Sequence, residues 1–208
     1  MIELFTSDTP NGKKITILLE EIGCEFKVTS IDLSKDEQFK PEFKKISPFG
    51  KIPVIVDHEN QESVFESGAI LIYLAEKYNK FYEIKDRNVI NQWLMAQIGT
   101  IGPMLGQHHQ FHHYNPGKSK FGEERFFKIS KRLYDELDER LSSSKYLAGN
   151  DYTIADIATW PWISRHEWHD IGLKNYKNLT RWYSDIANRK AVIQGYDIFK
   201  NGSEIPKP

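Results

Sequence analysis

Two short segments of the chain carry polar residues where a helix is expected to begin. The first reads Thr9-Pro10-Asn11-Gly12, in which threonine is a good N-cap and proline is favoured at the first helical position. The second is Glu66-Ser67, which stands before an amphipathic stretch. A helix N-terminus with a hydroxyl or amide donor can stabilise an anion, including a thiolate. Both segments are therefore candidate anion sites, although each residue taken alone is more often only a cap or a turn former.

Four of the seven histidines lie close together, at His108, His109, His112 and His113. In a helix they would form two i, i+4 pairs, a spacing that can bind zinc. No carboxylate or cysteine lies among them, so a tetrahedral set of ligands stays incomplete, and Pro103 and Gly106 argue against a continuous helix. We therefore expect no metal. We expect these histidines, with Phe111, to line a pocket, and plain surface histidines are the alternative.

The first 80 residues alternate short β-type runs with amphipathic helical stretches. The expected strands cover residues 2–5, 26–32, 53–58 and 62–66. Between the first two, Ile15, Leu18 and Ile22 recur at helical spacing, and Gly23 is a plausible helix stop. A short helical piece is expected near residues 38–45, and Ser67 is expected to cap a last helix. The predicted order is β-α-β-α-β-β-α.

After the polar stretch of residues 79–88, almost the whole chain is predicted to be helical. Candidate helices cover residues 89–99, 123–142, 154–170 and 179–189. All five tryptophans lie after residue 92, a change in composition that suggests two domains. We expect an N-terminal domain over residues 1–80, a linker over 81–87 and an all-helical domain over 88–208. Thr153 and Asp156 have the spacing of a capping box, which predicts a helix start without chemistry.

The overall composition excludes several classes of protein. Twenty-eight Lys and Arg stand against 29 Asp and Glu, so no broad basic field attracts nucleic acid or anionic lipid. The mean hydropathy of -0.56 and the absence of a long apolar run predict no membrane span. The single cysteine, Cys24, cannot form an intrachain disulfide, and the N-terminus lacks the pattern of a secretory signal. We expect a cytoplasmic protein in which Cys24 is a small buried hydrophobe.

Six segments spread over the chain carry a recognisable pattern: TPNGKKITILLEE, QFKPEF, ISPFGKIPVIVD, FESGAILIYLAEKY, GPMLGQ and YTIADIATWPW. Together they resemble a cytosolic glutathione transferase, and more narrowly the bacterial nu class, whose members reduce disulfides with glutathione. FESGAI and KIP occur in many glutathione transferases, whereas the TPNG turn and GPMLGQ are more specific to the class. The resemblance covers Ile2 to about Arg189. It implies an α/β plus all-α chain, with a thioredoxin-like domain before the helical one, a homodimer, and reduced or oxidised glutathione as the bound co-substrate.

The resemblance also implies roles for individual residues. Thr9 and Asn11 would be catalytic, because they occupy the turn that carries C-x-x-C in redox-active thioredoxin relatives and could hold a bound thiolate. Asn11 would also bind glutathione. Glu66 and Ser67 would hold the ammonium and carboxylate of the γ-glutamyl group, and Ile52, before a cis proline, would pair with the cysteinyl backbone. Further glutathione contacts are implied for Gln38, Lys51 and Arg125, with Arg132 as the alternative to Arg125.

The activity that the resemblance implies is glutathione-dependent disulfide-bond oxidoreduction, with weak transferase or peroxidase activity, on a small-molecule or protein disulfide. One alternative is a conventional glutathione S-transferase that conjugates electrophiles, for which Ser7 is a candidate activator. The other is a non-enzymatic regulatory or binding protein with the same fold. The complete set of Asn11, Ile52-Pro53 and Glu66-Ser67 favours an enzyme, because a pure scaffold has no need of these groups.

Overall fold

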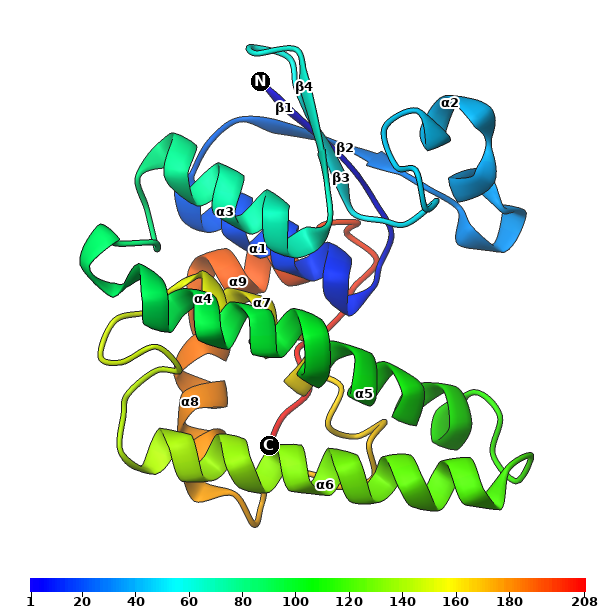
Figure 1. The fold of residues 1–208 in the computed structure, drawn as a ribbon, viewed down its shortest axis with the longest axis vertical. Coiled ribbons are helices and arrows are strands. Elements are labelled where there is room, and N and C mark those ends of the chain that lie inside the picture. The colour runs from blue at the N-terminus through cyan, green and yellow to red at the C-terminus, as the bar shows by residue number, and fades with distance from the viewer.

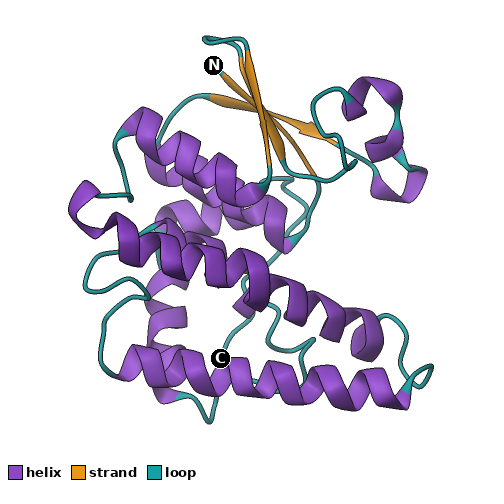
Figure 2. Cartoon of the chain, viewed as in Figure 1, coloured by secondary structure: helices purple, strands orange, loops and turns teal.

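The N-terminal part of the computed structural model, which describes all 208 residues, is built on a four-stranded mixed sheet (Figures 1 and 2). The strands are β1 (Ile2–Thr6), β2 (Phe26–Ser30), β3 (Val54–Asp57) and β4 (Glu62–Phe65), in the spatial order β2-β1-β3-β4. β1 and β2 are parallel, and β3 is antiparallel to β1 and β4. With helices α1 (Pro10–Ile22), α2 (Pro41–Lys44) and α3 (Ser67–Tyr78), the predicted β-α-β-α-β-β-α order is confirmed.

The first helix begins and ends where its sequence predicts. The Thr9 side chain accepts a hydrogen bond from the Gly12 amide at 3.1 Å, and Pro10 is the first helical residue. At the other end Gly23 adopts a left-handed φ of 74°, and its amide closes the last turn on the Leu19 carbonyl. α1 is therefore fixed at both ends, and its N-terminus stands directly after β1.

The second helical start differs from the prediction. Ser67 is the first helical residue of α3, and Glu66 occupies the N-cap position with a φ of 71° and no capping side-chain bond. A non-glycine residue in a sparsely populated backbone conformation costs on the order of 1–3 kcal/mol, and such residues are enriched at functional sites. The prediction that Ser67 caps this helix is therefore wrong, because Glu66 takes the cap position and Ser67 keeps its hydroxyl for other contacts.

The C-terminal part is helical. Its α-helices are α4 (Arg87–Ala96), α5 (Gly102–His108), α6 (Lys120–Ser142), α7 (Ile154–Ile163), α8 (Lys177–Ala187) and α9 (Lys190–Tyr196). Helix α9 was not predicted; Gly195 lets it approach α1 so closely that a Cβ there would lie 2.7 Å from the Ile17 backbone. The helix predicted over residues 154–170 ends at Ile163, after which the chain continues in i→i−3 turns.

A continuous helical rod connects α4 to the histidine segment, contrary to the expected break. Two π-helical stretches, Gln97–Ile101 and His109–His113, flank α5 and keep the backbone helical through Pro103. Proline is tolerated here because it falls in the first turn of α5, after a π-helical turn. Gly106 is required for packing, since a Cβ there would lie 3.2 Å from the Trp162 ring of α7.

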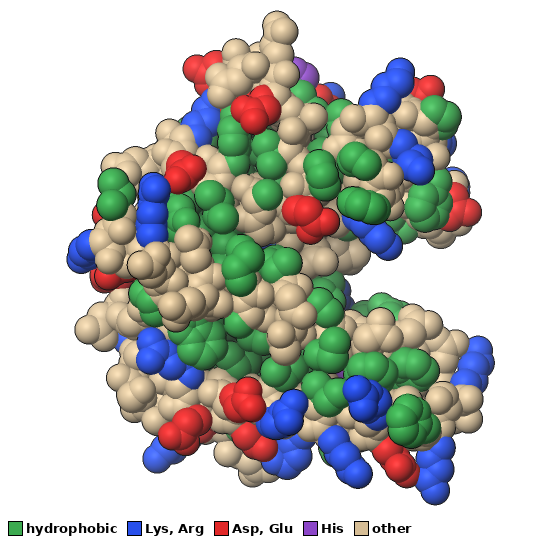
Figure 3. Space-filling view, viewed as in Figure 1, with side chains coloured by type: hydrophobic (Ala, Val, Ile, Leu, Met, Phe, Trp, Pro, Cys, Tyr) green, Lys and Arg blue, Asp and Glu red, His purple; other side chains and the backbone are tan.

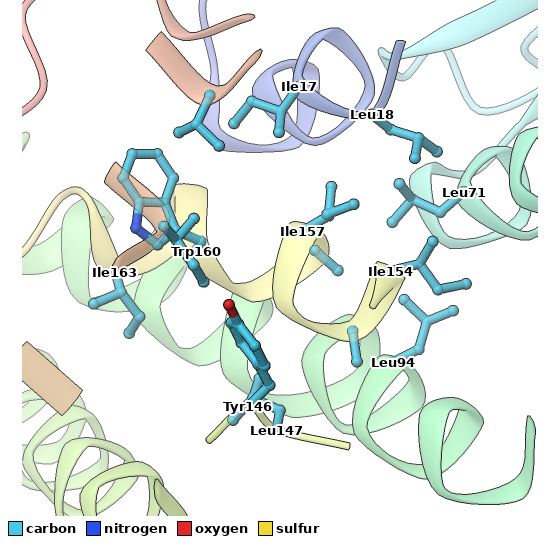
Figure 4. Packing of buried hydrophobic residues seen from close by; sticks show 14 of the residues in the cluster. Ile17, Leu18, Leu71, Leu94, Tyr146, Leu147, Ile154, Ile157, Trp160 and Ile163 are labelled. Atoms are coloured by element: carbon cyan, nitrogen blue, oxygen red, sulfur yellow. The ribbon is translucent and has the colours of Figure 1, made fainter. Parts of the chain in front are cut away.

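One hydrophobic core of 36 buried residues extends through both parts of the chain. Helix α7 lies at its centre, where Figure 4 shows Ile154 and Ile157 of α7 among side chains from α1, α3 and α4. A smaller cluster of Ile31, Phe43 and Val54 lies apart, under α2. None of the helices combines the length and apolar character needed to cross a bilayer. The continuous core fixes α1, α3, α5 and α7 relative to one another.

Candidate active site

The start of α1 faces a cleft between the N-terminal part and the helical part. Three cavities of about 130, 380 and 350 Å³ lie along it, and Asn11 lines all three. Figure 3 shows the molecule hollowed on one side, between the lobe that carries α2 and the ends of α5 and α6. The sequence thus places its most suggestive turn at the point where the three cavities meet.

Thr9 and Asn11 combine a structural role with free hydrogen-bond donors. Thr9 Oγ1 accepts the Gly12 amide, and its own hydroxyl hydrogen remains able to donate. Asn11 Oδ1 accepts a hydrogen bond from the indole Nε1–H of Trp162 at 3.1 Å. An indole nitrogen only donates, so the oxygen of the Asn11 amide must face it, and the Nδ2 group is left with two hydrogens. The cleft therefore receives a hydroxyl, an amide and the N-terminus of α1.

Glu66 and Ser67 lie at the start of α3 beside Asn11, and all three residues line both the 130 Å³ and the 380 Å³ cavities. Ser67 is buried, whereas Glu66 is exposed. The open amides at the helix N-terminus and the Ser67 hydroxyl suit a carboxylate, and the Glu66 carboxylate suits an ammonium group. The structure therefore brings together these two residues and Asn11, as the sequence predicted.

The segment before β3 supplies a backbone edge. The Ile52-Pro53 peptide bond is cis. The backbone N–H and C=O of Ile52 form none of the backbone hydrogen bonds found in the turns, loops and caps of the chain. The residue before Ile52, Lys51, is held by the Ser47 hydroxyl. This hydroxyl accepts a hydrogen bond from the Lys51 amide at 2.9 Å and donates one to the Lys51 carbonyl at 2.8 Å. The Lys51 side chain is exposed and lines two of the cavities. Ser47 is a positioning residue that sequence reasoning missed.

Gln38 also lines the 350 Å³ cavity. It is buried, and its Oε1 atom has no hydrogen-bond partner in the chain. Gly50 packs against it with a φ of 59°, and a Cβ there would lie 2.8 Å from the Gln38 carbonyl oxygen. A buried amide oxygen without a partner is costly unless a ligand donates to it. Gln38 is therefore suited to a ligand with N–H groups.

A buried lysine adds a feature that the sequence reasoning missed. Lys14 of α1 is 1% exposed, and its Nζ donates to Gln97 Oε1 at 2.6 Å and to Ser67 Oγ at 3.2 Å. Burial lowers the pKa of Lys14 to about 7, against an opposing effect of Glu66. The available signal was helical spacing, because Lys14 lies one turn before Leu18 on the buried face of α1.

Of His108 and His109, which are both buried, only His109 lines one of the three cavities. His109 lines the 350 Å³ cavity with Tyr114 and Trp162, and burial lowers its pKa to about 3. His108 is buried elsewhere and bonds to the His169 carbonyl. The expectation that Phe111 lines the pocket is wrong, because its ring stacks on Phe126 at 5.3 Å, where α6 approaches closely. No group of three or more His, Cys, Asp or Glu side chains is positioned to hold a metal.

Three other side chains from the sequence reasoning lie outside the cleft cavities. Arg125 is exposed on α6 and lines none of them. Arg132 pairs with Glu136 one turn away at 3.7 Å on the exposed surface of the same helix. Cys24 follows the C-terminus of α1, half-buried against the core, and burial raises the pKa of its thiol. Neither arginine is brought to Asn11, and the only cysteine is at the wrong end of α1 to react there.

Comparisons with known proteins show the family of the chain. The sequence-family model of the glutathione S-transferase N-terminal domain matches residues 2–76 of the chain, and the family model of the C-terminal domain matches residues 107–190. The chain is 45% identical over 201 residues to the disulfide-bond oxidoreductase YfcG of Escherichia coli, covering 93% of this chain and 94% of that protein.

Two solved structures are also similar. A glutathione transferase from Burkholderia graminis, with two glutathione molecules bound per subunit, has a TM-score of 0.90 and 35% identity, covering 97% of this chain and 89% of that one. A glutathione transferase from Pseudomonas putida, with one glutathione disulfide bound per subunit, has a TM-score of 0.87 and 36% identity, covering 95% and 91%. With both domains matched in order and a relative so similar over nearly its whole length, this chain belongs to the glutathione S-transferase family.

Proposed function

We propose that this protein reduces disulfide bonds with glutathione, and that glutathione supplies the reacting thiols. One observation carries the proposal: Asn11 lines all three cavities of the cleft, whereas the only cysteine lies beyond the far end of α1. The 13 residues of α1 separate the two by roughly 20 Å at 1.5 Å per residue. The relative YfcG is a disulfide-bond oxidoreductase, which supports the same reaction.

The reaction consists of two thiol–disulfide exchanges. A glutathione thiolate attacks one sulfur of the substrate; a new S–S bond forms, the old one breaks, and the other sulfur leaves as a thiolate that takes up a proton. A second glutathione thiolate attacks the glutathione sulfur of this mixed disulfide and releases the remaining substrate thiol. Two glutathione molecules are oxidised to one glutathione disulfide, and the substrate disulfide is reduced to two thiols.

The chain's own residues stabilise the sulfur anions. The Nδ2 group of Asn11 and the Thr9 hydroxyl donate hydrogen bonds to the attacking thiolate, and the N-terminus of α1 lowers the pKa of the thiol. The same donors stabilise negative charge on the leaving sulfur, since both sulfurs lie in line at this turn. A cysteine in the protein is not required.

The residues that line the cleft also position the other parts of glutathione. The γ-glutamyl group lies at Glu66 and Ser67, the cysteinyl backbone pairs with Ile52, and Lys51 and Gln38 contact the glycine end. The Asn11 turn also borders the 350 Å³ cavity, which leaves room for a second sulfur compound. We place the second glutathione there, an arrangement supported by the two glutathione molecules of the B. graminis structure.

Three finer assignments belong to this proposal. The TPNG and GPMLGQ segments support membership of the nu class. Reduced glutathione is the co-substrate expected in a cytoplasmic location.

We propose a homodimer, supported by apolar side chains gathered along α4 and α5 in Figure 3 and by Met95 of α4, which is 50% exposed. Arg125, which lines none of the three cavities, is proposed to contact oxidised glutathione, and Arg125→Ala tests this.

The deciding assay is the reduction of 2-hydroxyethyl disulfide by glutathione, coupled to glutathione reductase. Asn11→Ala should lower kcat/KM about 5- to 150-fold, because one hydrogen bond to a thiolate contributes about 1–3 kcal/mol. Thr9→Ala should also lower it. Cys24→Ser is the matched control and should keep nearly full activity. Disulfide reduction should exceed conjugation to aryl halides, the reaction of a conventional transferase. An inactive Cys24→Ser enzyme beside a fully active Asn11→Ala enzyme would refute the mechanism.

A further inference from the structure

Two adjacent lysines of α1 are both buried, and only one of them has an acidic partner. Lys13 is 4% exposed and forms an ion pair with Asp8 at 2.7 Å. Lys14 is 1% exposed and forms no ion pair; its two partners are the neutral oxygens of Gln97 and Ser67. A buried ammonium without an anion is costly, and in proteins such charges are usually paired. Lys14 therefore has an unmet requirement for a negative charge.

The surroundings of Lys14 supply further donors. Lys14, Ser67 and Gln97 line the 380 Å³ cavity, which also borders Asn11 and Glu66. Gln97 is fully buried in the π-helical stretch after α4, and its Nε2 atom has no hydrogen-bond partner. The third Lys14 hydrogen, the Gln97 amide and the hydroxyl hydrogen of Ser67 are thus available at one wall of the cavity. This set of donors, without a matching acceptor, fits a carboxylate.

The position of the donors selects one carboxylate of glutathione. Ser67 joins Lys14 to the start of α3, where the γ-glutamyl group is placed. The glycine carboxylate belongs at the other end of the tripeptide, beside Lys51 and Gln38 in the 350 Å³ cavity. Resting on the proposed function, we infer that Lys14 is the buried counter-ion of the γ-glutamyl α-carboxylate, with Gln97 as a second donor to it. Glu66, facing the same cavity, is left to pair with the α-ammonium group.

This assignment makes ligand affinity depend on pH. Because burial lowers the pKa of Lys14 to about 7, a large part of the free protein carries a neutral amine above that pH. A bound carboxylate favours the ammonium form, so ligand binding takes up a proton. Glu66 is the only charged group of the chain whose field acts noticeably on Lys14. Affinity should therefore fall as the pH rises above 7.

The test measures the dissociation constants of three thiol-free ligands by calorimetry. The first is ophthalmic acid, in which a methyl group replaces the thiol of glutathione. The second is its analogue with 4-aminobutyrate in place of γ-glutamate, which lacks only the α-carboxylate. The third is ophthalmic acid amidated at the glycine end. Without a thiol, none of these ligands releases a proton from sulfur, so proton uptake reports on the protein and on the ligand amine.

In the wild-type protein, loss of the α-carboxylate should weaken binding about 10- to 100-fold, as expected for a charged hydrogen-bonded pair. Lys14→Met should weaken binding of ophthalmic acid to a similar extent, and the α-carboxylate should then contribute little. Amidation at the glycine end should have the same effect in Lys14→Met as in wild type. Lys13→Met is the control, because it removes an equally buried lysine outside the cleft, and it should bind all three ligands as wild type does.

A second measurement needs no variant and applies even if Lys14→Met does not fold. Wild-type affinity for ophthalmic acid should fall between pH 7 and 8.5 by up to about tenfold per pH unit, whereas affinity for the 4-aminobutyrate analogue should stay nearly constant. Equal pH dependence for the two ligands, or additive effects of Lys14→Met and carboxylate loss, would overturn the inference and leave the proposed function intact. Failure of wild type to bind glutathione itself would instead refute the proposed function.

Discussion

Helices α1 and α7 begin in the same way, with a threonine whose side chain caps the first turn, but their surroundings differ. At α7, Thr153 and Asp156 form a capping box, and the fully buried Asp156 also accepts from the Leu147 amide and the Trp182 indole. At α1, Thr9 caps the helix and Asn11 uses only its oxygen, on Trp162. The polar groups at the start of α7 are all hydrogen-bonded within the fold, whereas the start of α1 keeps free donors that face the cleft.

The comparison separates structural from functional helix starts that look alike in sequence. A cap that is buried and fully bonded contributes stability, and its replacement should affect folding. A cap beside a cavity with unused donors contributes less to stability and more to ligand binding. Burial and hydrogen-bond satisfaction therefore decide which role a Thr-capped helix start has, and neither quantity can be read from a four-residue motif.

The largest expected effect is on stability at the α7 start. Asp156→Ala should lower the free energy of unfolding by about 3–5 kcal/mol, because it leaves the Leu147 and Thr153 amides and the Trp182 indole without an acceptor in the core. Urea unfolding monitored by tryptophan fluorescence measures it. Asn11→Ala is the matched control and should change the same quantity by less than about 1 kcal/mol. Similar losses for the two variants would remove the distinction between the two helix starts.

Buried histidines near the cleft predict a smaller, pH-dependent effect. Burial lowers the pKa of His109 to about 3 and that of His169 well below its ordinary value, whereas unfolded histidine titrates near 6.5. Below pH 6.5 the unfolded chain binds more protons than the folded chain. Stability should therefore be highest above about pH 7 and fall as the pH is lowered toward 5, by a few kcal/mol at most.

The measurement is the urea unfolding free energy at several pH values between 7.5 and 5. Burial raises the pKa of Asp156 to about 6, which opposes the histidine effect, so the informative quantity is a difference between proteins. His109→Phe keeps an aromatic ring between Trp162 and His169 and should show a shallower decline on acidification. If His109→Phe and wild type lose stability in parallel, His109 is not responsible.

How far the sequence predicts this molecule depends on how local each feature is. The caps of α1 and α7 and the β-α-β-α-β-β-α order of the N-terminal part follow from short-range patterns, and they are confirmed. The helix through Pro103 was not predicted, because the π-helical turn before it has no local sequence signal. Glu66 at the cap position of α3 likewise has no pattern of its own.

The predicted site was incomplete for a related reason. Thr9 and Asn11 are near neighbours in sequence, so a motif finds them together. Lys14 comes from α1, Gln97 from the π-helical stretch after α4, and Trp162 from α7, and they meet only because one core packs these helices against one another. A single sequence records no such contact, and spacing arguments do not reach across 83 or 151 residues.

The smallest predicted effect concerns Trp162, which orients the Asn11 amide. Trp162→Phe removes the indole N–H but keeps an aromatic ring, so the amide can rotate and turn its oxygen toward the thiolate. We expect kcat/KM for disulfide reduction to fall about fivefold, equivalent to about 1 kcal/mol, and the pKa of the bound glutathione thiol to rise. The ultraviolet absorbance of the thiolate against pH reports the second change, which a purely structural defect would not produce.

A double-mutant cycle decides whether Trp162 acts through Asn11. In the Asn11→Ala background Trp162→Phe should have no further effect on kcat/KM, because the group it orients is gone. Trp168→Phe is the control: its ring stacks on His113 at 4.1 Å and has no bond to Asn11, so its activity should match wild type. Independent, multiplicative losses in the double variant would show that Trp162 shapes the cleft without orienting Asn11. The donors that stabilise the thiolate at the start of α1 would then act without an orienting contact from Trp162.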